Sequence, residues 1–198
     1  MNINQEISKV EDVSQDLVQL FLEPYKDHCK YLRKAQFQYP KIESIADTSK
    51  NKEQGLWSIK GEFSIPESCY IAATGHFNSV EFNICYNQLC YTMIAHLIDK
   101  NLWEAMRDWD LPTYKQLQLS NFLIVKFSSI FRKPIDSQHF LGSLSINKCS
   151  VRGDLIIVKT SCAFYDQNDG WSEGDVTFAV LNGKPKKQLD SYVESVAV

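Results

Sequence analysis

The spacing of hydrophobic residues predicts a helix, two strands, a long helix and then four more strands. Residues 13–22 carry apolar side chains three and four positions apart, which is helical spacing, and Pro24 ends this helix. Alternating apolar positions predict strands, because successive side chains of a strand point to opposite faces. The predicted strands are residues 31–39, 56–65, 122–131, 140–151, 154–165 and about 173–181.

Residues 78–99 form the clearest predicted helix. Between Val80 and Ile98 this segment is apolar almost all round, and its polar interruptions are Asn83, Asn87, Gln88 and His96. A helix that is apolar on all sides lies inside a core. Amides in such a helix need hydrogen-bond partners, because an unpaired buried amide is costly.

The remaining segments are predicted to be loops and tails. Residues 102–118 are predicted to form a short helix and a covering loop. Residues 41–54 are predicted to form a polar connection between strands. Residues 1 to about 10 are expected to be disordered or loosely docked, and the tail from residue 183 is polar. The pattern predicts an α+β fold in a single domain over residues 1–198, with its core at about 20–182.

Composition narrows the class of protein. The formal net charge of −3 argues against a dedicated nucleic-acid binder. No apolar run approaches the length of a membrane-spanning helix, and the first residues lack the features of a secretion signal. The six cysteines have no zinc spacing, so no metal is expected, and a cytoplasmic protein with reduced thiols is predicted.

The polar stretch at residues 67–81 leads directly into the long helix. Asn78 is a good N-cap, and Glu81 three positions later completes the pattern of a capping box. Free N–H groups at a buried helix N-terminus can also polarise a carbonyl. Asn78 and Glu81 can serve as a cap, a site, or both. His76 beside them titrates near neutral pH, although a lone histidine is more often structural.

Other polar residues have competing interpretations. Asn87 is the hardest to explain as core, because leucine or alanine would fit better there. Cys85 and Cys90 flank it, but buried free cysteines usually behave as small hydrophobic residues, so no cysteine nucleophile is expected. Arg132 and Lys133 either bind phosphates of coenzyme A or phosphopantetheine, or mark a solvated strand end.

Several motifs resemble the FcoT-like thioesterase family over about residues 20–182. They are Leu22-Glu23-Pro24-Tyr25, Tyr70-Ile71, Thr74-Gly75-His76-Phe77-Asn78, Val80-Glu81, Asn87-Gln88-Leu89 and Phe131-Arg132-Lys133-Pro134. The resemblance implies a hotdog fold, in which an antiparallel sheet wraps around a long central helix. It also implies active-site residues at Tyr25, Tyr70, Asn78 and Asn87. The family lacks the carboxylate pattern of better-known hotdog thioesterases.

The resemblance leaves the reaction open between three functions. Hydrolysis of a fatty acyl-CoA or acyl-carrier-protein thioester is the first, with His76 or Glu81 orienting the attacking water. The second is glycine addition to an enoyl thioester on acyl carrier protein, an activity assigned to relatives in isonitrile lipopeptide pathways. The third is a non-catalytic acyl-thioester binder.

The expected partners follow from the same resemblance. No cofactor is expected beyond the coenzyme A or phosphopantetheine of the substrate, which Arg132 and Lys133 would bind. Family analogy predicts a homodimer or a trimer of dimers. The run of residues 122–131 contains more apolar surface than one sheet face requires, which fits an interface or a fully buried strand.

Overall fold

The computed structural model describes residues 7–41, 57–72 and 75–182. The helices are α1 (Gln15–Leu22), α2 (Ser79–Asp99) and α3 (Leu111–Leu117), with short 3-10 helices η1 (Asp27–Cys29) and η3 (Glu104–Met106). The strands are β1 (Ile7–Asp12), β2 (Leu32–Pro40), β3 (Trp57–Phe63), β4 (Phe122–Lys133), β5 (Phe140–Arg152), β6 (Leu155–Tyr165) and β7 (Trp171–Leu181). The polar connection predicted at 41–54, apart from residue 41, and the tail predicted from residue 183 lie outside the described residues.

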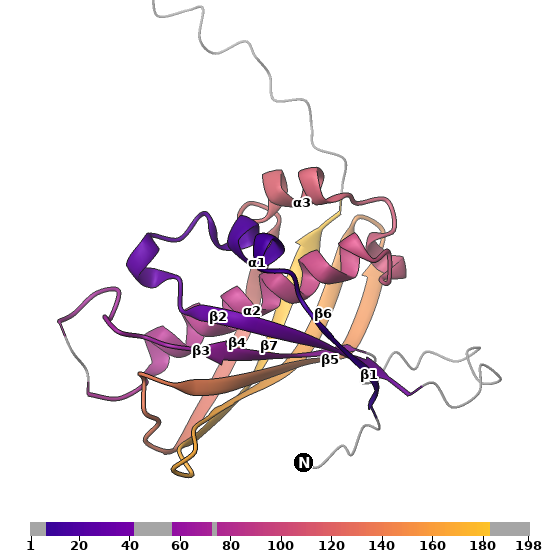
Figure 1. Ribbon diagram of the computed structural model, residues 1–198. Coiled ribbons are helices and arrows are strands. Elements are labelled where there is room, and N and C mark those ends of the chain that lie inside the picture. The colour runs from indigo at the N-terminus through magenta and orange to yellow at the C-terminus, as the bar shows by residue number, and fades with distance from the viewer. Residues whose placement is uncertain (1–6, 42–56, 73–74, 183–198) are drawn as a thin grey trace, which may run out of the picture.

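Within the described residues, seven strands form one antiparallel sheet in the order β1-β2-β3-β5-β6-β7-β4. The long helix α2 runs across one face of this sheet, with α1 and α3 beside it (Figure 1). A long helix held against a broad antiparallel sheet is the hotdog arrangement. The predicted α+β hotdog fold is therefore confirmed.

Aromatic packing holds α2 against the sheet. The Phe82 ring lies 5.6 Å from that of Phe127, 5.7 Å from Phe131 and 4.9 Å from Phe164, measured between centroids. These partners come from β4 and β6, while the other side of α2 packs on β2 and β3. The helix is therefore fixed from both halves of the sheet, and burial of such rings is a large favourable contribution to folding.

Gln88, a predicted buried amide, has the partners that such a residue needs. Its Oε1 accepts hydrogen bonds from the backbone N–H groups of Tyr31 and Leu32, each at 2.9 Å. Its Nε2 donates to the carbonyl oxygen of Cys29 at 2.6 Å. Gln88 thus pins the segment between α1 and β2 to the middle of α2, which also fixes the position of the loop carrying Tyr25.

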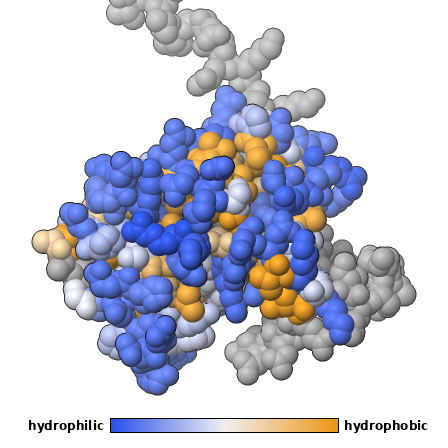
Figure 2. All heavy atoms as spheres, viewed as in Figure 1, coloured by the Kyte–Doolittle hydropathy of each residue, from blue (hydrophilic) through white to orange (hydrophobic). Residues whose placement is uncertain are grey.

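The predicted covering segment at 102–118 is confirmed as η3 and α3. Tyr114 of α3 stacks on Phe21 of α1 with ring centroids 4.7 Å apart, and Gln118 Nε2 donates to the Phe21 carbonyl at 2.9 Å. Hydrophobic residues remain visible in the upper part of the surface, where Figure 1 places α1 and α3 (Figure 2). Among the described helices, none is long and apolar enough to span a membrane.

One expectation about the N-terminus is wrong. Ile7–Asp12 is an edge strand, β1, with a shift in register between Ile7 and Lys9, rather than a disordered or loosely docked segment. Residues 1–6, which the same expectation covered, lie outside the described residues. Its side chains are mostly exposed, so the sequence shows no alternation of apolar and polar residues there. Backbone hydrogen bonds to β2 define this strand, and a hydrophobic pattern cannot reveal them.

The apolar run at the start of β4 is exposed. Among the described strands, β4 pairs only with β7, and it forms the opposite edge of the sheet from β1. Its residues Leu123, Ile124, Val125, Ile130 and Phe131 are between 41% and 64% exposed. Of the two interpretations of this run, the fully buried strand is therefore wrong, and an exposed apolar edge remains.

Candidate active site

Asn78 and Glu81 close the N-terminus of α2. The Oδ1 of Asn78 accepts hydrogen bonds from the backbone N–H groups of Val80 at 2.9 Å and Glu81 at 3.3 Å. In return, Glu81 Oε2 accepts from the backbone N–H of Asn78 at 3.3 Å and from its Nδ2 at 3.1 Å. The predicted capping box is confirmed, and it occupies two of the N–H groups that could otherwise polarise a substrate carbonyl.

The capping box narrows the role that Glu81 can take. Its side chain is buried, with the residue only 1% exposed, and the carboxylate is directed at Asn78. A carboxylate held in this way is satisfied by hydrogen bonds rather than by water. Of the two interpretations of Glu81, the geometry favours the cap over contact with a substrate.

We predict that Asn78→Ala lowers the free energy of unfolding by about 1–2 kcal/mol, because it removes the cap and a partner of the buried Glu81 carboxylate. Asn78→Ser keeps a capping oxygen, so we expect it to retain most of the stability and most of the turnover. Chemical denaturation of both variants measures the change in stability, and kcat/KM measures the change in turnover. A stable but inactive Asn78→Ser protein would show that the amide contacts the substrate.

A cavity of about 430 Å³ opens between the α2 N-terminus and the end of β4. It brings together four of the eight predicted site residues, which are His76, Asn78, Arg132 and Lys133. The segment before α2 is held against the chain after β4 by a 3.3 Å hydrogen bond from the Phe77 backbone N–H to the Ile135 carbonyl. Residues far apart in the sequence thus form one hollow lined by both polar and apolar side chains. We call it the α2–β4 cavity.

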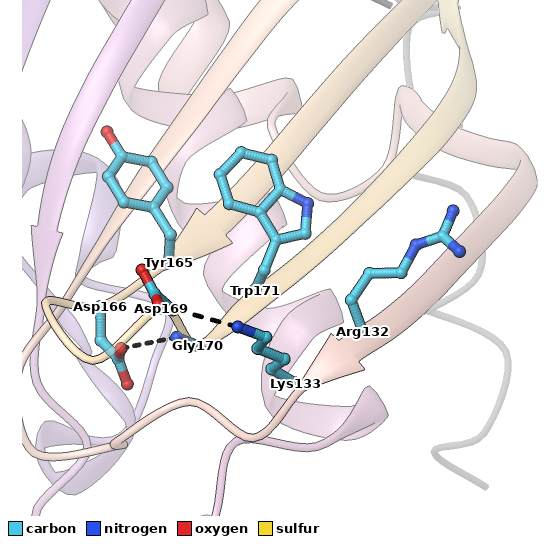
Figure 3. Close-up of a pocket in the computed structure, with 7 residues that line it drawn as sticks. All are labelled: Arg132, Lys133, Tyr165, Asp166, Asp169, Gly170 and Trp171. Carbon is cyan, nitrogen blue, oxygen red and sulfur yellow. Dashed lines mark hydrogen bonds and ion pairs between the residues drawn. The ribbon is translucent and has the colours of Figure 1, made fainter.

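Arg132 and Lys133 also line a second hollow of about 500 Å³, together with residues at the ends of β6 and β7 and the loop between them (Figure 3). Lys133 Nζ lies 3.7 Å from an oxygen of Asp169, and Arg132 donates to Glu173 Oε1 at 2.9 Å. Hydrogen bonding to Arg132 lowers the pKa of the Glu173 carboxyl. The four side chains are between 41% and 87% exposed, and ion pairs at the surface are weak. A phosphate could therefore replace either acid as the partner of these cations.

Tyr25 follows α1 and packs beside the middle of α2. The side chain is half-buried against the core. Burial raises the pKa of its hydroxyl well above the usual value, and the nearby Tyr91 adds to the shift. Burial also raises the pKa of Tyr91 to about 12. Both phenols therefore stay protonated at neutral pH, so they can donate hydrogen bonds and do not act as bases.

Asn87 lies one helical turn before Tyr91. Together with Ser79 and Asn83 these residues recur at intervals of four along α2, and we call the set Ser79, Asn83, Asn87 and Tyr91 the α2 stripe. Three of them are half-buried, and Ser79 is exposed and lines the α2–β4 cavity. The stripe thus connects the cavity, where Arg132 and Lys133 lie, to the region of Tyr25.

Asn83 is the member of the stripe that was not among the predicted site residues. Its Oδ1 is buried, and no described residue donates a hydrogen bond to it. Asn87 likewise makes no side-chain hydrogen bond to the described part of the chain. The signal that could have identified Asn83 is its spacing of four residues from Asn87 within an otherwise apolar helix.

Tyr70 stands apart from the other predicted residues. It is 52% exposed, in the irregular segment between β3 and α2. No hydrogen bond or ring contact joins it to another residue within the described ranges. Residues 73 and 74, between Tyr70 and the α2–β4 cavity, are not described. Its assignment therefore still rests on the motif alone.

The two cysteines of α2 are poor nucleophiles. Burial raises the pKa of the Cys85 thiol well above its usual value and that of Cys90 to about 12. A thiol attacks only as the thiolate, so neither group is activated at neutral pH. This agrees with the expectation that they serve as small core residues.

The chain belongs to the FcoT-like thioesterase family. The model of the FcoT-like thioesterase domain matches residues 20–180. This range agrees with the extent predicted from the motifs. The shared chemistry of the family centres on an acyl thioester, which fits a site with neutral hydrogen-bond donors and nearby cations.

Curated relatives carry a more specific name. A protein of Streptomyces coeruleorubidus is 37% identical over 166 residues, covering 81% of this chain and 93% of the relative. A protein of Mycobacterium tuberculosis (strain H37Rv) is 35% identical over 174 residues, covering 86% of this chain and 88% of the relative. Both are named (2E)-enoyl-[ACP] glycyltransferase.

Solved structures resemble the fold only distantly. A thioesterase family protein from Silicibacter pomeroyi gives a TM-score of 0.41 at 11% identity, covering 84% of this chain and 99% of that protein. A Staphylococcus aureus protein in complex with CoA gives a TM-score of 0.42 at 8% identity, covering 69% of this chain and 75% of that protein. These likenesses carry no weight in the functional argument.

Proposed function

We propose that this protein adds glycine to a (2E)-enoyl thioester carried by an acyl carrier protein. The observation that carries the proposal is the shared name of relatives that are 35–37% identical over more than four fifths of the chain. Glycine addition was one of the alternatives from the sequence. Hydrolysis of the thioester remains the second candidate, because the family model describes a thioesterase domain.

The reaction balances without a cofactor. The neutral amine of glycine attacks C3 of the enoyl group and forms a C–N bond. The electron pair of the double bond moves to C2 and the thioester oxygen as an enolate. C2 then gains a proton and the nitrogen loses one, so the product keeps the thioester. The barrier falls if hydrogen-bond donors are directed at the oxygen where charge develops.

Tyr25 and Asn87, near the middle of α2, are neutral groups that can donate hydrogen bonds to the enolate oxygen. Tyr25 keeps its proton because burial raises its pKa, and the Asn87 amide has unused hydrogen-bond capacity. In this proposal both donate to the thioester oxygen. His76 lines the α2–β4 cavity, and in this proposal it relays protons, a common role of histidine in general acid–base catalysis. In the hydrolytic alternative the same donors would hold the thioester carbonyl.

Arg132 and Lys133 are proposed to bind the phosphate of the carrier-bound phosphopantetheine. Both line the α2–β4 cavity at the start of the α2 stripe, and their present partners, Glu173 and Asp169, are exposed acids. Arginine and lysine are the usual partners of phosphate in proteins. The substrate arm would then run from this cavity along the stripe toward Tyr25.

We predict that Lys133→Ala raises KM for the carrier-bound substrate about fivefold and leaves kcat nearly unchanged, because the charge acts in binding and not in the chemical step. The effect should shrink at high salt, which screens exposed charges. The matched control is Lys159→Ala, which removes an exposed lysine on β6. A drop in kcat with unchanged KM would contradict the phosphate assignment.

The exposed edge of β4 supports a homodimer. An unpaired strand with several exposed apolar residues is a template for pairing with another chain. Phe131 and Arg132 belong both to this edge and to the lining of the α2–β4 cavity. A second copy paired along β4 would therefore cover the apolar edge and lie beside the site.

For this dimer we predict that Val125→Glu yields a monomer in light scattering coupled to size exclusion. Val125 is 64% exposed at the centre of the apolar edge, and a buried unpaired charge there opposes association. Val151→Glu changes a similarly exposed valine on β5 (56%) and should leave the assembly intact. A Val125→Glu protein of unchanged mass would refute pairing along β4.

The proposed reaction is tested by comparing an enoyl with a saturated acyl carrier protein. Mass spectrometry of the carrier should reveal a gain of one glycine only with the enoyl substrate, because addition needs the C2–C3 double bond. Release of free acid from both substrates, without glycine, would support hydrolysis instead. Tight binding of both with no change in mass would indicate a non-catalytic binder.

A further inference from the structure

Asn83 carries a buried hydrogen-bond acceptor that is not satisfied within the described residues. Its Oδ1 has almost no exposed surface and receives no hydrogen bond from them. The residue as a whole is half-buried, so this part of α2 is close to the surface. Most buried polar atoms in proteins are paired, because an unpaired one costs free energy. A ligand with an N–H or O–H group could satisfy this atom.

Asn83 lies midway between two parts of the proposed site. At 1.5 Å rise per residue it is about 6 Å along the helix axis from Ser79 and about 6 Å from Asn87. Ser79 lines the α2–β4 cavity with Arg132 and Lys133. Asn87 lies at the other end, one turn before Tyr91, which is a neighbour of Tyr25. A ligand bound at both ends must pass Asn83.

The neighbours of Asn83 suit a chain of mixed polarity. Val80, three positions before it, is 41% exposed, and Ile84, one position after it, is half-buried. These apolar side chains and the Asn83 amide alternate over about 6 Å of helix. The pantetheine arm likewise alternates methylene and methyl groups with amides, and each of its amides has an N–H to donate.

We propose that Asn83 recognises the pantetheine arm of the substrate by accepting a hydrogen bond from one of its amide N–H groups. The inference rests on the proposed function, in which the substrate is a phosphopantetheine thioester. Glycine is a less suitable donor, because the amine must reach the enoyl group near Tyr25 and Asn87 rather than the middle of the arm. Asn83 is thus a substrate-binding residue that positions the thioester.

The test compares wild type with Asn83→Leu, which has a similar shape and no acceptor. Two unreactive probes are used, an alkyl pantetheine thioether and the thioether of the same alkyl chain with ethanethiol, which has no amide. We expect the variant to bind the pantetheine probe about fivefold more weakly, a typical value for one neutral hydrogen bond. Affinity for the ethanethiol probe should be unchanged.

Measuring the stability and the assembly of Asn83→Leu distinguishes a role in substrate binding from a structural role. Leucine removes an unsatisfied acceptor, so the unfolding midpoint of Asn83→Leu should equal or exceed that of wild type. Equal affinity of both proteins for the pantetheine probe would overturn the inference. A lower midpoint, or a weakened dimer, would overturn it as well, because Asn83 would then be satisfied by the protein itself.

Failure of this inference differs from failure of the proposed function. The probes do not react, so their binding does not depend on which reaction the enzyme performs. If wild type adds glycine but Asn83→Leu binds the pantetheine probe normally, only the role of Asn83 is wrong. If wild type adds no glycine but the binding difference is found, the reaction is wrong and the role of Asn83 stands.

Discussion

Replacing Tyr25 with phenylalanine is expected to lower kcat/KM about 100-fold, since loss of one hydrogen bond to a developing oxyanion costs roughly this much. The reason lies in its environment, where burial keeps the phenol protonated and able to donate. The measurement is glycine addition to a carrier-bound enoyl substrate under steady-state conditions. The loss should be the same from neutral to moderately alkaline pH, because Tyr25 does not ionise in that range.

Stability should change little in Tyr25→Phe. No described residue receives a hydrogen bond from its hydroxyl, so removing that group leaves no protein partner unpaired. Tyr39→Phe is the control for activity. Tyr39 lies on β2, and its hydroxyl contacts Glu11 and His96 rather than residues of the proposed site. A Tyr25→Phe enzyme with wild-type kcat/KM would exclude Tyr25 as a donor to the substrate.

Asn87→Ala is the second change for which we expect a large loss, again about 100-fold in kcat/KM. The Asn87 amide makes no hydrogen bond to the described protein, and it lies one turn from Tyr91, the neighbour of Tyr25. Because no internal bond is lost, unfolding should occur at nearly the wild-type denaturant concentration. Asn168→Ala, in the exposed β6–β7 loop, is the control.

A double-mutant cycle then tests whether Tyr25 and Asn87 act on one oxygen. If both donate to the same enolate, the losses will not multiply, because the second removal acts on a site already impaired. The double variant should therefore be much less than 10,000-fold impaired, although the two single losses multiplied give about that figure. Fully multiplicative losses would indicate that the two residues act on separate groups or separate steps.

The core of the fold could be predicted because its residues are buried in regular patterns. The apolar segment between Val80 and Ile98 predicted α2, and Gln88 proved to have the partners that its burial demands. The edges could not be predicted equally well. β1 is held by backbone pairing with few buried side chains, and the apolar residues of β4 fit both a buried strand and an exposed edge.

Part of the candidate site could be proposed from the sequence, but the arrangement of its residues could not. The motifs identified His76, Asn78, Arg132 and Lys133, which the fold brings together in one cavity. The sequence could not separate the capping role of Asn78 from a catalytic one, since both use the same atoms. Asn83 was missed because only the three-dimensional structure reveals that its oxygen is buried without a donor.

The most direct test of the central claim follows glycine and thiol in one sample. Purified protein is incubated with a (2E)-enoyl acyl carrier protein and 15N-labelled glycine, and the intact carrier is analysed by mass spectrometry while free thiol is measured. The account predicts a carrier heavier by one labelled glycine and no release of thiol. Thiol release at the same rate with and without glycine, and no labelled carrier, would contradict it.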